Sequence, residues 1–211
     1  MADLPRRTIT ALVYGAVVLA AVAAPPIVFA LVLVVAGAVS LAELVALRRA
    51  GPVAAIQGAL VVIGLLALWV LRGVSPSVLL VVLSATWAAD VFAYLGGSRF
   101  GRHKIAPRIS PGKTWEGTLI GFVAAGVVFL VMSRAFGGWY PLDIVVAMGI
   151  GPVAFAGDML ESWTKRRAGV KDSGSFLPGH GGMMDRIDSL VATAPFVLLP
   201  LLIPCCAPSL G

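Results

Sequence analysis

A polar block from Ser162 to Asp188 holds most of the side chains that could carry out chemistry. Its sequence, SWTKRRAGVKDSGSFLPGHGGMMDRID, combines five basic residues, three acids, one histidine and several glycines. Because the chain as a whole is 59% hydrophobic, so polar a segment must lie at an aqueous surface. Basic side chains bind phosphates and carboxylates bind hard cations, so the block indicates chemistry on a triphosphate.

Carboxylates gather at one predicted end of the apolar segments. Asp158, Glu161 and Lys165 recur at helical spacing and should form one stripe where a helix leaves the membrane. Asp185 and Asp188 are three residues apart and should face the same way at the start of the next helix. Six acids are expected at this end, namely Asp90, Glu116, Asp158, Glu161, Asp185 and Asp188.

Asp90 is expected to be the most buried of these acids. It lies inside a predicted helix, on a stripe with Thr86 and Tyr94 that should face the helix bundle, and an acid in such a place is by default a functional candidate. Ion pairs between helices, with Arg166 or Arg186, are the alternative use of these carboxylates. Carboxylate oxygens suit Mg²⁺. The predicted metal ligands are Asp90, Asp158, Asp185 and Asp188.

Two glycine-rich segments could present an amide or a lysine to a phosphate. Gly179–Gly182 precedes a predicted helix whose N-terminal dipole favours an anion, and a plain turn is the alternative. The second segment ends in GKT but has Pro107 where a P-loop needs its first glycine, which excludes a P-loop ATPase. Lys113 remains a candidate phosphate ligand. His180 is the candidate site histidine, whereas His103 is expected to be a solvated surface residue.

The composition is that of a membrane protein. Mean hydropathy is +0.98 and only 12% of the residues are charged, against roughly 25% in a soluble domain. A helix that crosses a bilayer needs roughly 20 apolar residues. Seven spans are predicted, at 9–24, 26–47, 53–71, 76–95, 115–135, 142–161 and 187–204. The predicted fold class is therefore an all-α polytopic membrane protein.

Alternatives remain for the N-terminal segment. Pro25 and Pro26 separate the first two spans, so residues 9–47 form either two helices or one re-entrant hairpin. Residues 1–24 also fit a cleaved signal peptide, since Arg6 and Arg7 precede an apolar run. The six further spans favour an uncleaved first helix.

The basic residues predict the orientation of the chain. With the N-terminus inside, 14 of the 16 Lys and Arg residues fall in cytoplasmic segments, and only Arg72 and Arg134 lie outside. Enrichment of cations in short cytoplasmic loops is the positive-inside rule. We therefore expect a cytoplasmic N-terminus, an external C-terminus and two large polar loops facing the cytoplasm.

These motifs resemble those of the phosphatidate cytidylyltransferase family, also called CDP-diacylglycerol synthases. The family pattern S-x-x-K-R, K-D-x-G, P-x-H-G-G and D-R-x-D is complete between Ser162 and Asp188. D-x-x-A-Y-x-x-G at Asp90–Gly97, S-P-x-K-T-x-E-G at Ser110–Gly117 and G-D-x-x-E-S at Gly157–Ser162 are also similar to the family. The resemblance covers residues 84–195.

The resemblance implies that CTP and phosphatidic acid react to give CDP-diacylglycerol and pyrophosphate. It implies Mg²⁺ as the cofactor, with a second cation as an open alternative. The implied catalytic residues are Asp158, Lys165, Arg166, His180 and Asp185. The implied substrate-binding residues are Ser110, Lys113, Thr114, Glu116, Ser162, Lys171, Asp172, Gly181, Gly182 and Arg186.

The resemblance also implies the organisation of the chain. Residues 1–75 should form N-terminal membrane helices, fewer than is usual in the family, and residues 76–211 a catalytic membrane domain. The protein is expected in the inner (plasma) membrane, multi-pass, with its active site on the cytoplasmic face. CTP and phosphatidic acid are the expected partners and nucleic acid is not. The choice between a monomer and a homodimer is left open.

Two other functions are alternatives to this one. A related CTP-dependent membrane lipid enzyme, of the CDP-archaeol synthase or polyprenol kinase type, would share part of the chemistry. An ion transporter would also place ionisable groups in helices, but usually at the bilayer midplane and with paired repeats. Here the acids are predicted at one face and no repeat is visible, which disfavours a transporter.

Overall fold

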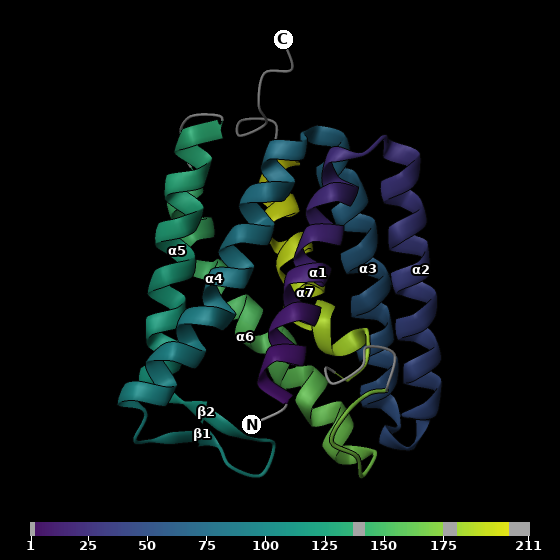
Figure 1. The fold of residues 1–211 in the computed structure, drawn as a ribbon, viewed down its shortest axis with the longest axis vertical. Coiled ribbons are helices and arrows are strands. Elements are labelled where there is room, and N and C mark those ends of the chain that lie inside the picture. The colour runs from purple at the N-terminus through teal and green to yellow at the C-terminus, as the bar shows by residue number, and fades with distance from the viewer. Residues whose placement is uncertain (1–2, 137–141, 175–180, 203–211) are drawn as a thin grey trace.

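The computed structural model describes residues 3–136, 142–174 and 181–202, with side chains from residue 13 onward. The described part is almost entirely helical, and Figure 1 shows its long helices side by side in one bundle. The elements are α1 (Asp3–Ala23), α2 (Pro26–Ala46), a 3₁₀ helix η1 (Arg48–Ala50), α3 (Pro52–Val74), α4 (Pro76–Phe100), β1 (Lys104–Ala106), β2 (Ser110–Thr114), α5 (Trp115–Phe136), α6 (Asp143–Arg167) and α7 (Met184–Leu201).

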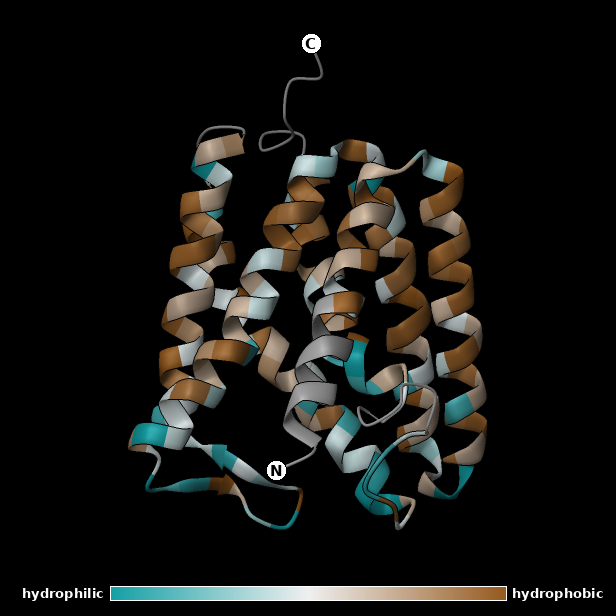
Figure 2. Cartoon of the chain, in the orientation of Figure 1, coloured by the Kyte–Doolittle hydropathy of each residue, from teal (hydrophilic) through white to brown (hydrophobic). Residues whose placement is uncertain are grey.

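Successive long helices run in opposite directions. The start of α1 and the β1–β2 hairpin therefore lie at one end of the bundle, and the end of α7 lies at the other (Figure 1). We call the first the hairpin end. Hydrophilic residues gather there, whereas the helices are hydrophobic along most of their length (Figure 2). The polar segments predicted to share one side of the membrane thus do share one end of the bundle.

The helices begin where the sequence supplies a suitable first residue. Pro26, Pro52 and Pro76 each open a helix, because proline needs no amide partner there and its φ already suits a helix. The Ser75 hydroxyl caps α4 by accepting a hydrogen bond from the Ser77 amide. Gly51 has a φ of 66°, which lets the chain reverse between η1 and α3.

The all-α membrane fold predicted from the sequence is confirmed. Among the described residues, five helices are long and apolar enough to cross a bilayer, namely α2, α3, α4, α5 and α6. Side chains of α1 are described only from Val13, so the apolar stretch that can be assessed there is Val13–Ala23, and α7 has 18 residues and begins with charged ones. The chain at 9–47 forms two separate helices of 21 residues each, which favours two spans over a re-entrant hairpin.

Small residues allow the helices that carry the polar side chains to approach closely. On α5, a Cβ added at Gly117 or Gly121 would lie 2.5 Å from a carbonyl oxygen of α4. A Cβ at Gly157 on α6 would lie 2.6 Å from the Asp188 carbonyl oxygen on α7. Close packing over small residues is typical of membrane helices. Here it brings the acids of α6 and α7 to the same place.

The β1–β2 hairpin was not predicted, since the sequence indicated only a basic loop. The two strands pair antiparallel, with Lys104 opposite Thr114 and Ala106 opposite Ser110. The hairpin leads directly into α5, where the Thr114 hydroxyl accepts a hydrogen bond from the Gly117 amide. The hairpin thereby holds Lys113, on β2, at the hairpin end of the bundle.

Candidate active site

A polar cavity of about 650 Å³ opens at the hairpin end of the bundle. Residues of both hairpin strands, of α4, α5, α6 and α7, and of the segment before α7 line it. The charged residues in its wall are Asp90, Lys104, Lys113, Asp158, Glu161, Lys165, Asp172, Asp185, Arg186 and Asp188. Most of the acids and cations singled out in the sequence thus share one cavity.

Three of these acids form a compact group, which we call the carboxylate trio. One oxygen from each of Asp158, Glu161 and Asp188 lies within 4.8 Å of the other two. The Glu161 side chain is almost fully buried, and its Oε1 atom has no hydrogen-bond partner among the described residues. A buried carboxylate oxygen without a hydrogen-bond donor is available as a ligand for a cation. The trio therefore fits a hard metal ion such as Mg²⁺.

The trio differs from the predicted ligand set at three residues. Glu161 belongs to it, although the sequence placed it only on the same stripe as Asp158. Asp185 instead forms an ion pair with Lys165, with 2.5 Å between Oδ1 and Nζ. Asp90 lines the cavity without belonging to the trio.

Two lysines neutralise part of this negative charge. Lys165 Nζ lies 2.5 Å from Glu161 Oε2 and, as noted, equally close to Asp185. Lys113 pairs with Asp158 and also lies 5.1 Å above the ring of Phe155. Ion pairs, with Arg166 or Arg186 as partners, are the alternative use of these acids. The structure has ion pairs between these acids and the two lysines, in the same cavity as the trio.

Asp185 is fixed in place by the segment that precedes α7. Its Oδ2 atom accepts hydrogen bonds from the Gly182 amide at 2.7 Å and from the Ser173 hydroxyl at 3.0 Å. Its Oδ1 atom accepts from Lys165. With its oxygens engaged on both sides, Asp185 orients the Lys165 ammonium towards the cavity.

Glu43 is a site residue that sequence reasoning missed. It lies on α2 and is buried, and its carboxylate accepts hydrogen bonds from the amides of Met183 and Met184, at 2.8 and 3.0 Å. The Ser173 hydroxyl lies 3.0 Å from its Oε2 atom. An acid inside the long apolar run of α2 was the signal that could have revealed it.

The glycine-rich segment was predicted to cradle a phosphate with its amides. Gly179 lies outside the described residues, so for the first part of this segment the phosphate cradle stays a prediction. The Gly182 amide donates to Asp185, and the amides of Met183 and Met184, which follow the segment, donate to Glu43. A Cβ at Gly182 would lie 2.1 Å from the Ser173 hydroxyl and 2.4 Å from Glu43. The glycine is therefore needed for the close approach of these side chains. His180 lies outside the described residues.

The expected burial of Asp90 is wrong. This residue was expected to be the most buried acid, facing the bundle, but it is exposed to the polar cavity. Exposure along its stripe rises towards the hairpin end. Thr86, one turn deeper in the bundle, is buried and hydrogen-bonded to Thr193 at 2.9 Å, whereas Tyr94, one turn nearer the hairpin end, is 75% exposed. The cavity opens between these two levels, and for this reason Asp90 meets solvent.

Several residues expected at the site lie beside the cavity rather than in its described wall. They are Ser110, Thr114, Glu116, Ser162, Arg166, Lys171, Gly181 and Gly182. Arg166 donates to the carbonyl oxygens of Ile109 and Val170. Glu116 pairs with His103 at 2.6 Å. His103 is indeed exposed, as predicted, and together these contacts hold the loops around the cavity.

Comparison with known proteins supports the motif resemblance. The sequence model of the cytidylyltransferase family matches residues 54–203. A phosphatidate cytidylyltransferase of Brucella abortus is 43% identical over 141 residues, 64% of this chain and 51% of that protein. One of Haemophilus influenzae is 43% identical over 124 residues, 56% of this chain and 43% of that protein. The chain spans about half the length of the curated relatives that it matches.

Proposed function

Because the chain belongs to the cytidylyltransferase family, we propose that it transfers the CMP group of CTP to phosphatidic acid. The products are CDP-diacylglycerol and pyrophosphate. One observation carries the proposal, which is that the carboxylate trio and two lysines share a polar cavity at the end of an apolar helix bundle. A nucleotide can reach such a cavity from water while a lipid reaches it from the bilayer.

The charge in the cavity wall favours a nucleotide that arrives with a divalent cation. The described wall holds six carboxylates and four basic side chains, a formal excess of two negative charges. An unaccompanied triphosphate would be repelled by that excess. Asp158, Glu161 and Asp188 would hold Mg²⁺, with Asp90 close by in the same wall. Bound there, Mg²⁺ supplies charge neutralisation to phosphate oxygens and to the departing pyrophosphate.

The side chains of the cavity then perform distinct tasks. An oxygen of the lipid phosphate attacks the α-phosphorus of CTP, and the bond from that phosphorus to the β-phosphate oxygen breaks. The attacking phosphate is already ionised, so no general base is required. Lys113 and Lys165 can exchange their carboxylate partners for phosphate oxygens, and Arg186 adds a planar donor. Positioning and electrostatic stabilisation account for most of the catalysis.

We also propose that the hairpin end faces the cytoplasm of a bacterial cell, with the helices in the inner membrane. The basic segments at that end support this orientation through the positive-inside rule. CTP is a cytoplasmic nucleotide, so a cavity at the basic, cytoplasmic end of the bundle is open to it.

An assay of the purified protein in detergent tests the proposal. The protein is mixed with CTP labelled in the cytosine ring, phosphatidic acid and Mg²⁺, and the label is followed into the lipid phase together with pyrophosphate release. We expect equimolar CDP-diacylglycerol and pyrophosphate. Label transfer only to an ether lipid or a polyprenol would contradict the proposed substrate. Transfer of the γ-phosphate instead of CMP would contradict the reaction.

A further inference from the structure

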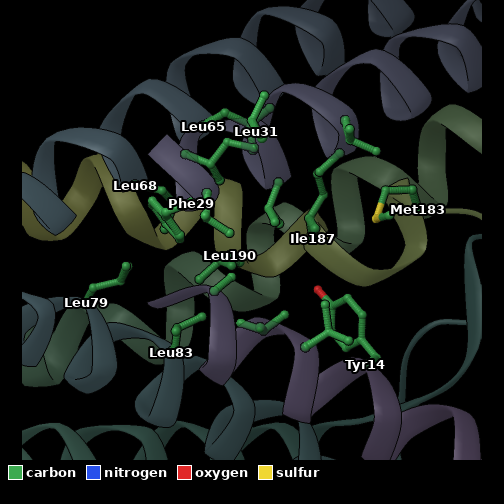
Figure 3. A pocket seen from close by; sticks show the side chains of 18 of the residues that line it. Tyr14, Phe29, Leu31, Leu65, Leu68, Leu79, Leu83, Met183, Ile187 and Leu190 are labelled. Carbon is green, nitrogen blue, oxygen red and sulfur yellow. The ribbon is translucent and has the colours of Figure 1, made fainter. Parts of the chain in front are cut away.

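A second cavity, of about 470 Å³, lies between α1, α2, α3, α4 and α7. Figure 3 shows side chains of these helices around it, among them Phe29, Leu68, Leu83 and Leu190. Tyr14 is the only polar side chain among the described residues that line it. We call this cavity the apolar groove. Neither the motifs nor the reaction proposed above makes use of it.

The first turns of α7 separate the apolar groove from the polar cavity. Asp185 and Asp188 line the polar cavity, whereas Ile187 and Leu190, on the same turns, line the groove. Tyr14 marks the junction, because its hydroxyl points towards α7 (Figure 3) and donates to the Arg186 carbonyl oxygen at 3.4 Å. The groove and the polar cavity thus lie on two sides of the first turns of α7, with Tyr14 at the junction.

The groove is open on one side. Val13 and Leu31, at its rim, are 56% and 58% exposed, and Val28 is 40% exposed. In a chain whose helices span a membrane, this opening faces the hydrocarbon of the bilayer. A lipid can therefore enter sideways without crossing water.

We propose that the apolar groove binds one acyl chain of the lipid phosphate whose head group reacts in the polar cavity. The proposal rests on the proposed function and adds the place of the lipid tail. The volume lies in the range of about 300–1,000 Å³ that ligand pockets occupy. A polar head group would lose its hydrogen bonds in this apolar lining, whereas a hydrocarbon chain loses none. The shared α7 turns place head group and tail on two sides of one helix.

A pair of tryptophan substitutions on α2 tests the groove through kinetics. Val28→Trp should fill it, and Val34→Trp is the control, because Val34 is also exposed but lines a different groove between α2 and α3. With dipalmitoyl phosphatidic acid, Val28→Trp should raise the KM about tenfold, as expected when roughly two methylenes lose their burial. With dihexanoyl phosphatidic acid, and for CTP, the KM should not change.

An equal effect of Val28→Trp on long and short lipids would overturn the proposal. So would an effect of Val34→Trp as large as that of Val28→Trp.

Photolabelling tests the same groove without turnover. A phosphatidic acid with a diazirine in one acyl chain is added to the protein in nanodiscs and irradiated, and the labelled peptides are identified. Label should appear on α2 and α7 residues of the groove, should be displaced by unlabelled phosphatidic acid but not by phosphatidylcholine, and should be lost in Val28→Trp. Equal displacement by both lipids, or no label in the groove, would overturn the proposal. Correct labelling of a protein that makes no CDP-diacylglycerol would instead refute the proposed function alone.

Discussion

At the scale of single residues, Lys165 joins two carboxylates that come from different helices. Glu161 precedes it by one turn on α6, and Asp185 opens α7. Both the lysine and Glu161 are buried, so the ammonium compensates charge that water cannot reach. The same ammonium faces the cavity in which phosphates are proposed to bind. We therefore expect both stability and catalysis to depend on the Lys165 side chain.

Lys165→Met should both destabilise the fold and abolish turnover. Removing one partner of a buried ion pair leaves an uncompensated charge, which costs about 3–5 kcal/mol. The double variant Lys165→Met, Glu161→Gln should recover much of the stability, because the buried charge is removed with its partner, but none of the activity. Thermal unfolding in detergent and the label-transfer assay measure the two effects. Wild-type stability of the single variant would show that the ion pair is not needed.

At the scale of elements, the site depends on contacts that fix α7 against α2 and α6. The N-terminal amides of α7 are bound by Glu43 from α2, and the close approach of α6 depends on Gly157. Neither residue lies in the described wall of the polar cavity. Glu43 and Gly157 nevertheless determine the position of Asp188 on α7 relative to Asp158 on α6.

Glu43→Ala should loosen the start of α7. Two buried amides would lose their acceptor, at about 1–3 kcal/mol for each. Glu43→Gln keeps one carbonyl oxygen as an acceptor and should be intermediate in stability. Thermal unfolding and turnover, measured in parallel, should fall in the order wild type, Gln, Ala. A Glu43→Ala protein with both properties unchanged would exclude a positioning role.

Gly157→Ala should push α6 and α7 apart. The new Cβ would meet backbone of α7 rather than a side chain that can rotate away. The control is Gly73→Ala on α3, where nothing lies within 4 Å of the new methyl group and alanine favours the helix. We expect lower turnover for Gly157→Ala and normal turnover for Gly73→Ala. Equal activity of the two variants would argue against close packing at Gly157.

The boundaries of these elements could be predicted from the sequence better than their contacts. Hydropathy located the long helices closely, and three of them begin at Pro26, Pro52 and Pro76, because both signals act locally. The membership of the carboxylate trio could not be derived in the same way. Helical spacing places Glu161 beside Asp158, but whether Asp185 or Asp188 joins them depends on the rotation of α7. That rotation is set by Glu43, more than a hundred residues away in the chain.

At the scale of the whole molecule, the chain has two chemically different ends. The hairpin end carries the polar cavity and most of the basic residues. At the opposite end, Arg72 donates to the carbonyl oxygens of Val22 and Ala24, and Asp143 accepts from Ser133. Arg72 thereby satisfies carbonyl oxygens at the end of α1, and the Ser133–Asp143 bond joins the end of α5 to the start of α6. The asymmetry is what the positive-inside rule needs in order to set a single orientation.

Cysteine labelling in intact cells checks this orientation. In a background where Cys205 and Cys206 are replaced by serine, His103→Cys should react with a membrane-impermeant maleimide only after the cells are opened. Ser75→Cys, at the opposite end, should react in intact cells. The exposed position of His103 makes its labelling a matter of access alone. The reverse pattern would contradict a cytoplasmic polar cavity.

The dependence of CDP-diacylglycerol synthesis on Mg²⁺, compared between two Asp→Asn variants, tests the central claim most directly. Asp188 belongs to the carboxylate trio, whereas Asp143 is buried at the far end of α6. We expect EDTA to abolish wild-type activity and Mg²⁺ to restore it. Asp188→Asn should need at least about tenfold to a hundredfold more Mg²⁺, or be inactive, while Asp143→Asn keeps the wild-type requirement. Synthesis in excess EDTA, or the same Mg²⁺ requirement in both variants, would contradict a metal-assisted reaction at the trio.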